Sequence, residues 1–202
     1  VTNLLCVSGD HQSLGVAPQA AGAFDLDPVQ LLQALRALRD EGTLLGGERV
    51  ASPPALFLGA VVHPCARPLK LNLIQTRKKV AAGAQFVLTQ PLFDLTGFEE
   101  WMGAVRAAGL HERTHIIASV RPLAGAEQAE ALRKRSPAVA LPDAVVARLR
   151  AARDPAREGI AICAELAAKA KAVRGVRGIH IQSGGREAAL APLLEQAGLT
   201  DA

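Results

Sequence analysis

Five short apolar runs divide the chain, and each one ends in a group of polar residues. The runs are continuous rather than alternating, which is typical of strands that are covered on both faces. They occupy residues 3–8, 56–62, 86–89, 115–119 and 178–182. A stretch of helical pattern follows each run. This alternation predicts an α/β fold with a parallel sheet and right-handed crossovers.

The helical patterns have recognisable starts and stops. Asp27 is placed as an N-cap before Pro28, which suits a first helical turn. Gly83 and Gly109 follow two of the patterns as C-terminal stops. The helices are predicted over residues 28–38, 72–82, 96–108, 127–134, 143–152, 155–173 and 186–197. Two architectures fit this order, a five-stranded doubly wound sheet and part of an eight-stranded barrel.

The polar residues behind the strands favour the barrel. In a doubly wound sheet, ligand-binding groups concentrate at one switch point, whereas all the strand-to-helix loops of a barrel face one site. Here all five apolar runs end in groups that can hydrogen-bond a ligand. A complete barrel takes about 250 residues, and this chain has 202. The sequence therefore predicts a partial (β/α)8 TIM barrel over residues 1–202. It is a single domain that holds the last five units and lacks strands one to three.

Composition and charge narrow the classes of function. The net charge of +4 suits an anionic small molecule, and the basic clusters lack the interleaved aromatic residues that favour nucleic acid. The three cysteines form no C-x-x-C pair, so neither a disulfide framework nor a zinc site is expected. No apolar run approaches the ~20 residues of a membrane span, and no signal peptide is visible. We expect a cytoplasmic protein with no metal and with neither a membrane nor nucleic acid as partner.

The residues alone leave several candidate sites ambiguous. The chain contains no G-x-G-x-x-G, P-loop, G-x-S-x-G or H-E-x-x-H motif. Asp10 follows a buried strand, where a functional carboxylate and a turn-capping one are about equally consistent with the sequence. Gln90 can bind a ligand or simply end a strand, and Lys78 and Lys79 can face phosphate or solvent. The "SGGRE" segment at residues 183–187 can bind an anion at a helix start or form a plain turn.

Several motifs, taken in order, resemble the methylenetetrahydrofolate reductase family, especially its bacterial forms with an SGDH- or TGD-type loop. They are "NLLCVSGD", "AFDLDPVQLL", "GAQFVLTQPLFD", "VRPL" and "VRGIHIQ". The most specific piece is "KKVAAGAQFVLTQPLFD" at residues 78–94. There a helix, its glycine stop, a strand and its polar end match together. The resemblance covers essentially all 202 residues.

This resemblance implies a flavin-containing (β/α)8 barrel that begins here at the family's fourth strand. Enzymes of the family take electrons from NADH or NADPH onto FAD. They reduce 5,10-methylenetetrahydrofolate to 5-methyltetrahydrofolate in one-carbon metabolism and methionine biosynthesis. The complete protein is expected to be a cytoplasmic homo-oligomer.

The resemblance also implies roles for individual residues. Ser8, Gly9 and Asp10 are expected along the flavin ring. Asp10 is the implied catalytic residue, between isoalloxazine and pterin, where its charge stabilises a cationic iminium form of the substrate. Further cofactor contacts are implied for Asp25, His63, Asn72, Gln75, Lys78 and Lys79. Substrate contacts are implied for Asp10, Gln90, Gln128 and Arg186.

One departure from the family pattern concerns the general acid. In the family this is a Glu on the first strand, and no segment here corresponds to that strand, so we expect this chain alone to be inactive. Two alternatives stay open, a subunit that binds FAD or folate without turnover and another flavin barrel such as a proline dehydrogenase. The pair of Asp10 and Gln90 fits a pterin better than an amino acid, which disfavours the proline dehydrogenase.

Overall fold

The computed structural model describes residues 2–9, 17, 19–20, 22, 25–136 and 139–200. Its five strands form one parallel sheet in the sequential order β1-β2-β3-β4-β5. They are β1 (Asn3–Cys6), β2 (Phe57–Val62), β3 (Phe86–Thr89), β4 (His115–Val120) and β5 (Val176–Ile181). All five strands predicted from the apolar runs are confirmed, and their ends differ from the prediction by two residues at most.

Helices connect the strands, and their ends follow the predicted capping residues. They are α1 (Pro28–Glu41), α2 (Leu69–Ala82), α3 (Leu95–Ala107), α4 (Ala126–Arg135), α5 (Asp143–Ala151), α6 (Pro155–Ala172) and α7 (Leu190–Gln196), with the short 3-10 helices η2 (Leu110–Glu112) and η3 (Glu187–Ala189). Asp27 caps α1, because its carboxylate accepts from the N–H of Gln30 while the Gln30 side chain accepts from the N–H of Asp27. Gly83 ends α2 with a φ of 120°.

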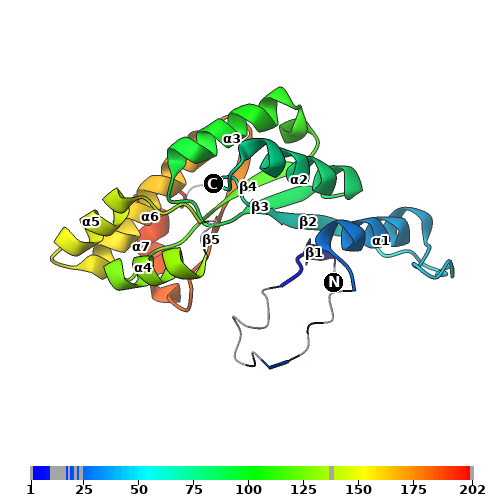
Figure 1. The fold of residues 1–202 in the computed structure, drawn as a ribbon, viewed down its shortest axis with the longest axis horizontal. Helices are drawn as coiled ribbons and strands as arrows, with labels where there is room; N and C mark the ends of the chain where they lie inside the picture. Colours follow the sequence, from blue (N-terminus) through cyan, green and yellow to red (C-terminus); the bar gives the residue numbers. More distant parts are fainter. Residues whose placement is uncertain are drawn as a thin grey trace.

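The strand order decides between the two predicted architectures. A sequential parallel order with right-handed crossovers places the connecting helices on one face, whereas a doubly wound sheet needs a reversal of strand order. In the structure α1 packs on β1 and β2, α2 on β2, and α6 on β4 and β5. Neighbouring helices also touch, α1 with α2, α2 with α3, and α3 with α6 (Figure 1). The fold is that of consecutive units of a (β/α)8 barrel.

The core lies between the sheet and these helices. Leu58, Ala60, Val87, Ile116 and Ala118 have no exposed surface. Because side chains alternate along a strand, the residues between them belong to the opposite face. We call that opposite face the inner face of the sheet.

The strand register arranges the inner face in rows. Leu5, Gly59, Phe86 and His115 lie side by side on four neighbouring strands. The Phe86 ring lies over Gly59, where an added Cβ would stand 2.1 Å from the ring, so only glycine fits there. Phe57 stacks on Phe86 with ring centroids 5.2 Å apart. Leu5 is 41% exposed, so this row is less covered than the helix side by the part of the chain that the structure describes.

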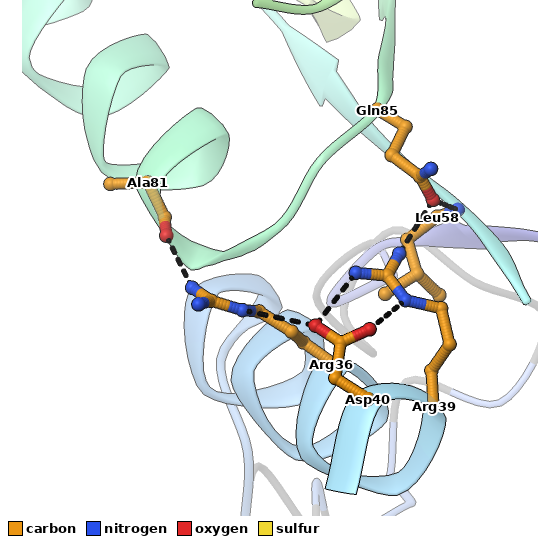
Figure 2. Close-up of polar contacts among 6 residues, drawn as sticks. All are labelled: Arg36, Arg39, Asp40, Leu58, Ala81 and Gln85. Atoms are coloured by element: carbon orange, nitrogen blue, oxygen red, sulfur yellow. Dashed lines mark hydrogen bonds and ion pairs between the residues drawn. The ribbon is translucent and has the colours of Figure 1, made fainter. Parts of the chain in front are cut away.

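Polar side chains at the N-terminal end of the sheet pair with one another. Gln85, just before β3, accepts at Oε1 from the N–H of Leu58 at 3.1 Å and from Arg39 at 2.6 Å. Arg39 also donates to both carboxylate oxygens of Asp40, at 2.6 and 3.1 Å, which lowers the pKa of Asp40. Figure 2 shows this network, with Arg36 approaching Asp40 at 3.5 Å. These contacts hold the end of α1 against β2 and β3.

The last helix is shorter than predicted. Gly184 and Gly185 have φ values of 63° and 82°, which lie outside the helical region and suit glycine. The chain turns at these glycines after β5. Arg186 then has a φ of −121° and a ψ of 54°, which are not helical, so the chain passes through η3 and begins α7 only at Leu190. The predicted helix over residues 186–197 becomes two shorter pieces.

Candidate functional site

A polar row crosses the inner face at the C-terminal ends of the strands. His63 and Gln90 directly follow β2 and β3, and the Gln90 N–H extends the ladder by donating to the carbonyl of Val62. Ser119 and His180 stand opposite each other on β4 and β5. Ligands of barrels and of open parallel sheets bind at this end of the strands, so this row is where a functional site is expected.

A cavity of about 380 Å³ lies at the ends of β1, β2 and β3, and we call it the strand-end cavity. It brings together five of the predicted site residues, Ser8, Gly9, His63, Lys79 and Gln90. The first two follow β1, whereas Lys79 reaches the cavity from α2. The volume falls in the range of roughly 300–1,000 Å³ that small-molecule sites occupy.

A second cavity, of about 310 Å³, adjoins the first along α2, and we call it the α2 cavity. His63 and Lys79 line both cavities. The α2 cavity adds the predicted residues Asn72 and Gln75 and the apolar side chain of Leu71. The two cavities therefore share His63 and Lys79 in their walls, and we call this shared wall the junction.

Lys79 places a partly buried ammonium group at this junction. Its Nζ donates to the carbonyl of Val61 at 2.6 Å, and an ammonium group has further N–H donors for a ligand. Burial lowers the pKa of Lys79, and the charge of Asp27 opposes that shift. The neighbouring Lys78 is exposed and lines neither cavity. The two adjacent lysines therefore differ sharply in their surroundings.

His63 offers a free ring nitrogen at the same junction. Its Nδ1 is buried and has no hydrogen-bond partner among the described residues. Burial lowers the pKa of the ring, and the charge of Lys79 lowers it further. Both causes favour the neutral imidazole. A buried polar atom without a partner costs free energy, and a ligand that hydrogen-bonds to Nδ1 would remove that cost.

Asn72 holds the loop between β2 and α2. Its side chain is 8% exposed, and its amide nitrogen donates to the carbonyls of His63, of Pro64 at 3.1 Å and of Ala66 at 3.4 Å. These bonds engage the amide nitrogen and position His63. The amide oxygen is the atom left for a ligand, so the cofactor role of Asn72 stays a prediction.

Of the other predicted residues, those that the structure describes do not line these cavities. Asp10 lies outside the described residues. Asp25 is exposed and lines neither cavity. The Gln128 side chain accepts from the N–H of Ala124 at 2.7 Å, near the start of α4. Arg186 follows β5 and has a buried Nη1 without a partner in the part of the chain that the structure describes.

The pair of Ser119 and His180 is absent from the predicted site residues. Ser119 Oγ and His180 Nδ1 are 3.0 Å apart, and the Ser119 N–H donates to Thr89 Oγ1 at 2.8 Å. Alternation along the last strand predicts His180 only as a satisfied face residue, and this contact satisfies one of its nitrogens. The pairing depends on a register shift between Ile116 and Ile117, which no sequence signal indicates.

Neither a metal site nor a membrane-spanning helix is found within the described ranges. No three His, Cys, Asp or Glu side chains gather where they could hold a metal ion. None of the described helices has the length and apolar character needed to cross a membrane.

Comparison with known proteins identifies the family. The family model described as "Methylenetetrahydrofolate reductase" matches residues 2–198. The chain belongs to the methylenetetrahydrofolate reductase family. The resemblance noted from the motifs at residues 3–10, 83–94 and 176–182 is therefore confirmed over nearly the whole chain. No curated protein matches it.

A solved structure supports the barrel fold of this family member. It is an uncharacterized protein from Clostridium thermocellum, described as binding two copies of 5-methyl-5,6,7,8-tetrahydrofolic acid. The two share 13% sequence identity with a TM-score of 0.55, and the match covers 71% of this chain and 52% of that one. The chain thus spans about half the length of that structure. At this identity the likeness shows a common fold.

Proposed function

We propose that this family member forms the flavin and folate sites of a methylenetetrahydrofolate reductase. The reaction is the reduction of 5,10-methylenetetrahydrofolate to 5-methyltetrahydrofolate in cytoplasmic one-carbon metabolism, with NADH or NADPH as electron donor. The observation that carries this proposal is the strand-end cavity, where Ser8, Gly9, His63, Lys79 and Gln90 meet in a chain of this family.

The residues present fit FAD. A dinucleotide carries two phosphates and a heterocycle with hydrogen-bonding edges. Lys79 supplies a cation in the wall that the two cavities share, and His63 Nδ1 is a buried ring atom that lacks a partner among the described residues. The cavities of about 380 and 310 Å³ suit a ligand with two bulky parts. We assign Ser8, Gly9, His63, Asn72, Gln75 and Lys79 to hold it.

When bound, FAD supplies the two-electron carrier between the nicotinamide donor and the folate. The chain's own residues bind and orient the cofactor and the folate. Lys79 offers N–H donors to phosphate or ribityl oxygens, and the neutral His63 hydrogen-bonds through Nδ1. Gln90 has one amide donor and one amide acceptor, which match the edge of a pterin.

Asp10 is the proposed catalytic residue. It follows Gly9, which lines the strand-end cavity and has a φ of 72°, a left-handed conformation that suits glycine. A carboxylate fixed there stabilises positive charge on the substrate as its methylene bridge opens to the iminium form. Gln128 and Arg186 are assigned to the folate and nicotinamide side, where a guanidinium can pair with a carboxylate or stack on a ring.

A two-step measurement on the purified chain tests this proposal. The first step titrates FAD and follows the change in visible absorbance, with circular dichroism to confirm folding. The second step adds NADH or NADPH to the FAD-loaded chain and follows nicotinamide oxidation, a half-reaction that does not need the missing general acid. Formation of 5-methyltetrahydrofolate from 5,10-methylenetetrahydrofolate is then measured in a complete protein that contains this segment. A folded chain that leaves the FAD spectrum unchanged contradicts the cofactor assignment.

A folate-binding role without turnover is the second candidate. The Clostridium thermocellum protein is described as binding 5-methyltetrahydrofolic acid, which favours ligand binding as the feature shared with this fold. The same experiment separates the two roles. Saturable binding of 5-methyltetrahydrofolate with no FAD-dependent nicotinamide oxidation supports the binding role and contradicts the reductase role.

A further inference from the structure

A separate cavity lies at the opposite end of the sheet from the proposed active site. Its volume is about 210 Å³, and we call it the basal cavity. It is lined by residues at the N-terminal ends of β2 to β5 and by η2. Apart from the acidic Glu112, the polar lining residues are Gln85, His111, Arg113, Thr114, His115 and Arg177. None of them lines the strand-end or the α2 cavity.

Two buried polar atoms in its wall have no partner within the described residues. The Thr114 side chain is 4% exposed, and its hydroxyl makes no hydrogen bond. His111 Nδ1 is likewise buried and unpaired. Buried polar groups nearly always have a partner, so each exception needs an explanation. The two atoms lie in neighbouring parts of one segment, and both of their residues line the same cavity.

The charges around the basal cavity favour an anion. Arg113 and Arg177 line it, and neither guanidinium forms an ion pair or hydrogen bond within the described ranges. The acidic lining residue is Glu112, whose side chain is 76% exposed and lies 3.9 Å from His111 Nε2. Arg113 and Arg177 are exposed as well, and two guanidinium groups against one carboxylate leave a positive excess.

The remaining lining groups are also mainly donors. Gln85 uses its Oε1 to accept from Arg39 and from the N–H of Leu58, which leaves its amide nitrogen for a ligand. Thr114 offers a hydroxyl. The rings of Phe57 and His115, with centroids 6.2 Å apart and planes inclined at 39°, form another side of the cavity. Guanidinium forks combined with hydroxyl and amide donors are the usual partners of phosphate oxygens.

We propose that the basal cavity binds a phosphate group, through the guanidinium groups of Arg113 and Arg177 and the hydroxyl of Thr114. The site is distinct from the proposed cofactor site and does not depend on the proposed reaction. Its volume of about 210 Å³ is below the roughly 300–1,000 Å³ of sites for whole drug-sized ligands. It therefore suits inorganic phosphate, or the phosphate end of a monoester whose remainder projects out.

Calorimetric titration of the purified chain at constant ionic strength tests this assignment. The probes are inorganic phosphate, glycerol phosphate as a simple monoester, and succinate as a dianion without phosphorus. Saturable binding of either phosphate probe is expected, with succinate binding at least about tenfold weaker. Tighter binding of inorganic phosphate points to the free ion, and tighter binding of glycerol phosphate points to a monoester. Equal binding of succinate, or no binding of either phosphate probe, overturns the proposal.

Matched variants locate the binding. Arg177→Gln should raise the Kd for phosphate about tenfold, which corresponds to about 1.4 kcal/mol. Arg49→Gln removes the same charge from an exposed position outside the cavity and should change the Kd by less than about twofold. Equal effects of the two variants would place the bound anion elsewhere and contradict the assignment.

Thr114→Val gives a second readout that a merely structural role would not produce. The variant removes an unpaired buried hydroxyl at nearly constant volume, so the melting temperature without phosphate should stay the same or rise. If Thr114 contacts the anion, the rise in melting temperature caused by phosphate should become smaller. An unchanged phosphate-induced shift in Thr114→Val contradicts a contact with this residue.

Discussion

Gln85 and Gln90 flank the same four-residue strand, β3, and have opposite surroundings. Gln85 precedes the strand and accepts two hydrogen bonds, from Arg39 and from the N–H of Leu58. Gln90 follows the strand and lines the strand-end cavity, where its side chain makes no hydrogen bond to the described residues. At one end of the sheet the amide oxygen is satisfied by the protein, and at the other the whole amide is available to a ligand.

This difference follows the general division of (β/α)8 barrels into a stabilising face and a functional face. Polar residues at the N-terminal face support stability, and those at the C-terminal face support function. The basal cavity is an exception to this division, because Thr114 and His111 have buried atoms without partners among the described residues close to the N-terminal ends of the strands. Variants on the two sides of β3 test how far the division holds.

The largest expected effect concerns Asp10, beyond the end of β1. In a complete protein that contains this segment, Asp10→Asn removes the carboxylate proposed to stabilise the iminium form and should slow folate reduction about a hundredfold. Reduction of the flavin by NADH or NADPH should change by less than about threefold, because that step does not involve the folate. Stopped-flow absorbance separates the two half-reactions. Equal slowing of both contradicts a position near the substrate.

A stability effect is expected at the other end of the sheet. Gln85→Leu leaves the N–H of Leu58 and one Arg39 donor without their acceptor, which should lower the free energy of unfolding by about 2 kcal/mol. Urea denaturation measures this change. FAD affinity should stay within about twofold of the wild type. A large loss of FAD binding in a folded Gln85→Leu protein would break the division between the two ends.

The adjacent lysines of α2 provide a matched pair for the cofactor. Lys79→Met keeps most of the side-chain volume but removes the ammonium group at the junction of the cavities, so the Kd for FAD should rise about tenfold. Lys78→Met removes the same charge from an exposed site and should change the Kd by less than about twofold. A flavin fluorescence titration measures both. Similar effects of the two variants would mean that long-range charge, rather than contact, controls binding.

Gln90→Leu is the counterpart of Gln85→Leu. It should raise the Kd for 5-methyltetrahydrofolate several-fold, up to about tenfold, by removing a hydrogen-bonding pair at the pterin edge. Because the Gln90 amide has no partner among the described residues, the free energy of unfolding should change by less than about 0.5 kcal/mol. Substantial destabilisation would show that this residue, like Gln85, supports the fold.

The smallest effect is a pH dependence of stability from His63. Burial and the nearby Lys79 lower the pKa of its ring in the folded protein. As the pH falls below the ordinary value of about 6.5, the unfolded chain therefore binds this proton first, and the folded state loses stability. The loss of stability between pH 7.5 and pH 5.5 should be smaller in His63→Asn than in the wild type. Equal losses in both proteins contradict a buried, neutral His63.

Much of the fold follows from local patterns in the sequence. The apolar runs predict all five strands, and Asp27 and Gly83 mark helix ends that the structure confirms. These signals work because strand burial and helix capping depend on residues close together in the chain. The last helix is shorter because Arg186 is not helical and Glu187–Ala189 form a 3-10 helix, which the helical pattern of these residues does not reveal.

The site is less predictable because it depends on where side chains point. The polar strand ends predict its location, and the cavities collect Ser8, Gly9, His63, Lys79 and Gln90 there. The direction of individual side chains has no such signal. Lys78 and Lys79 look alike in sequence, yet the rotation of about 100° between consecutive helical residues places one in solvent and the other at the cavities.

The contact between Ser119 and His180 has a consequence for hydrogen positions. A neutral His180 with its proton on Nε2 accepts the Ser119 hydroxyl proton at Nδ1, and one with its proton on Nδ1 donates to the Ser119 oxygen. The same 3.0 Å pair therefore suits either tautomer of the imidazole without moving a heavy atom.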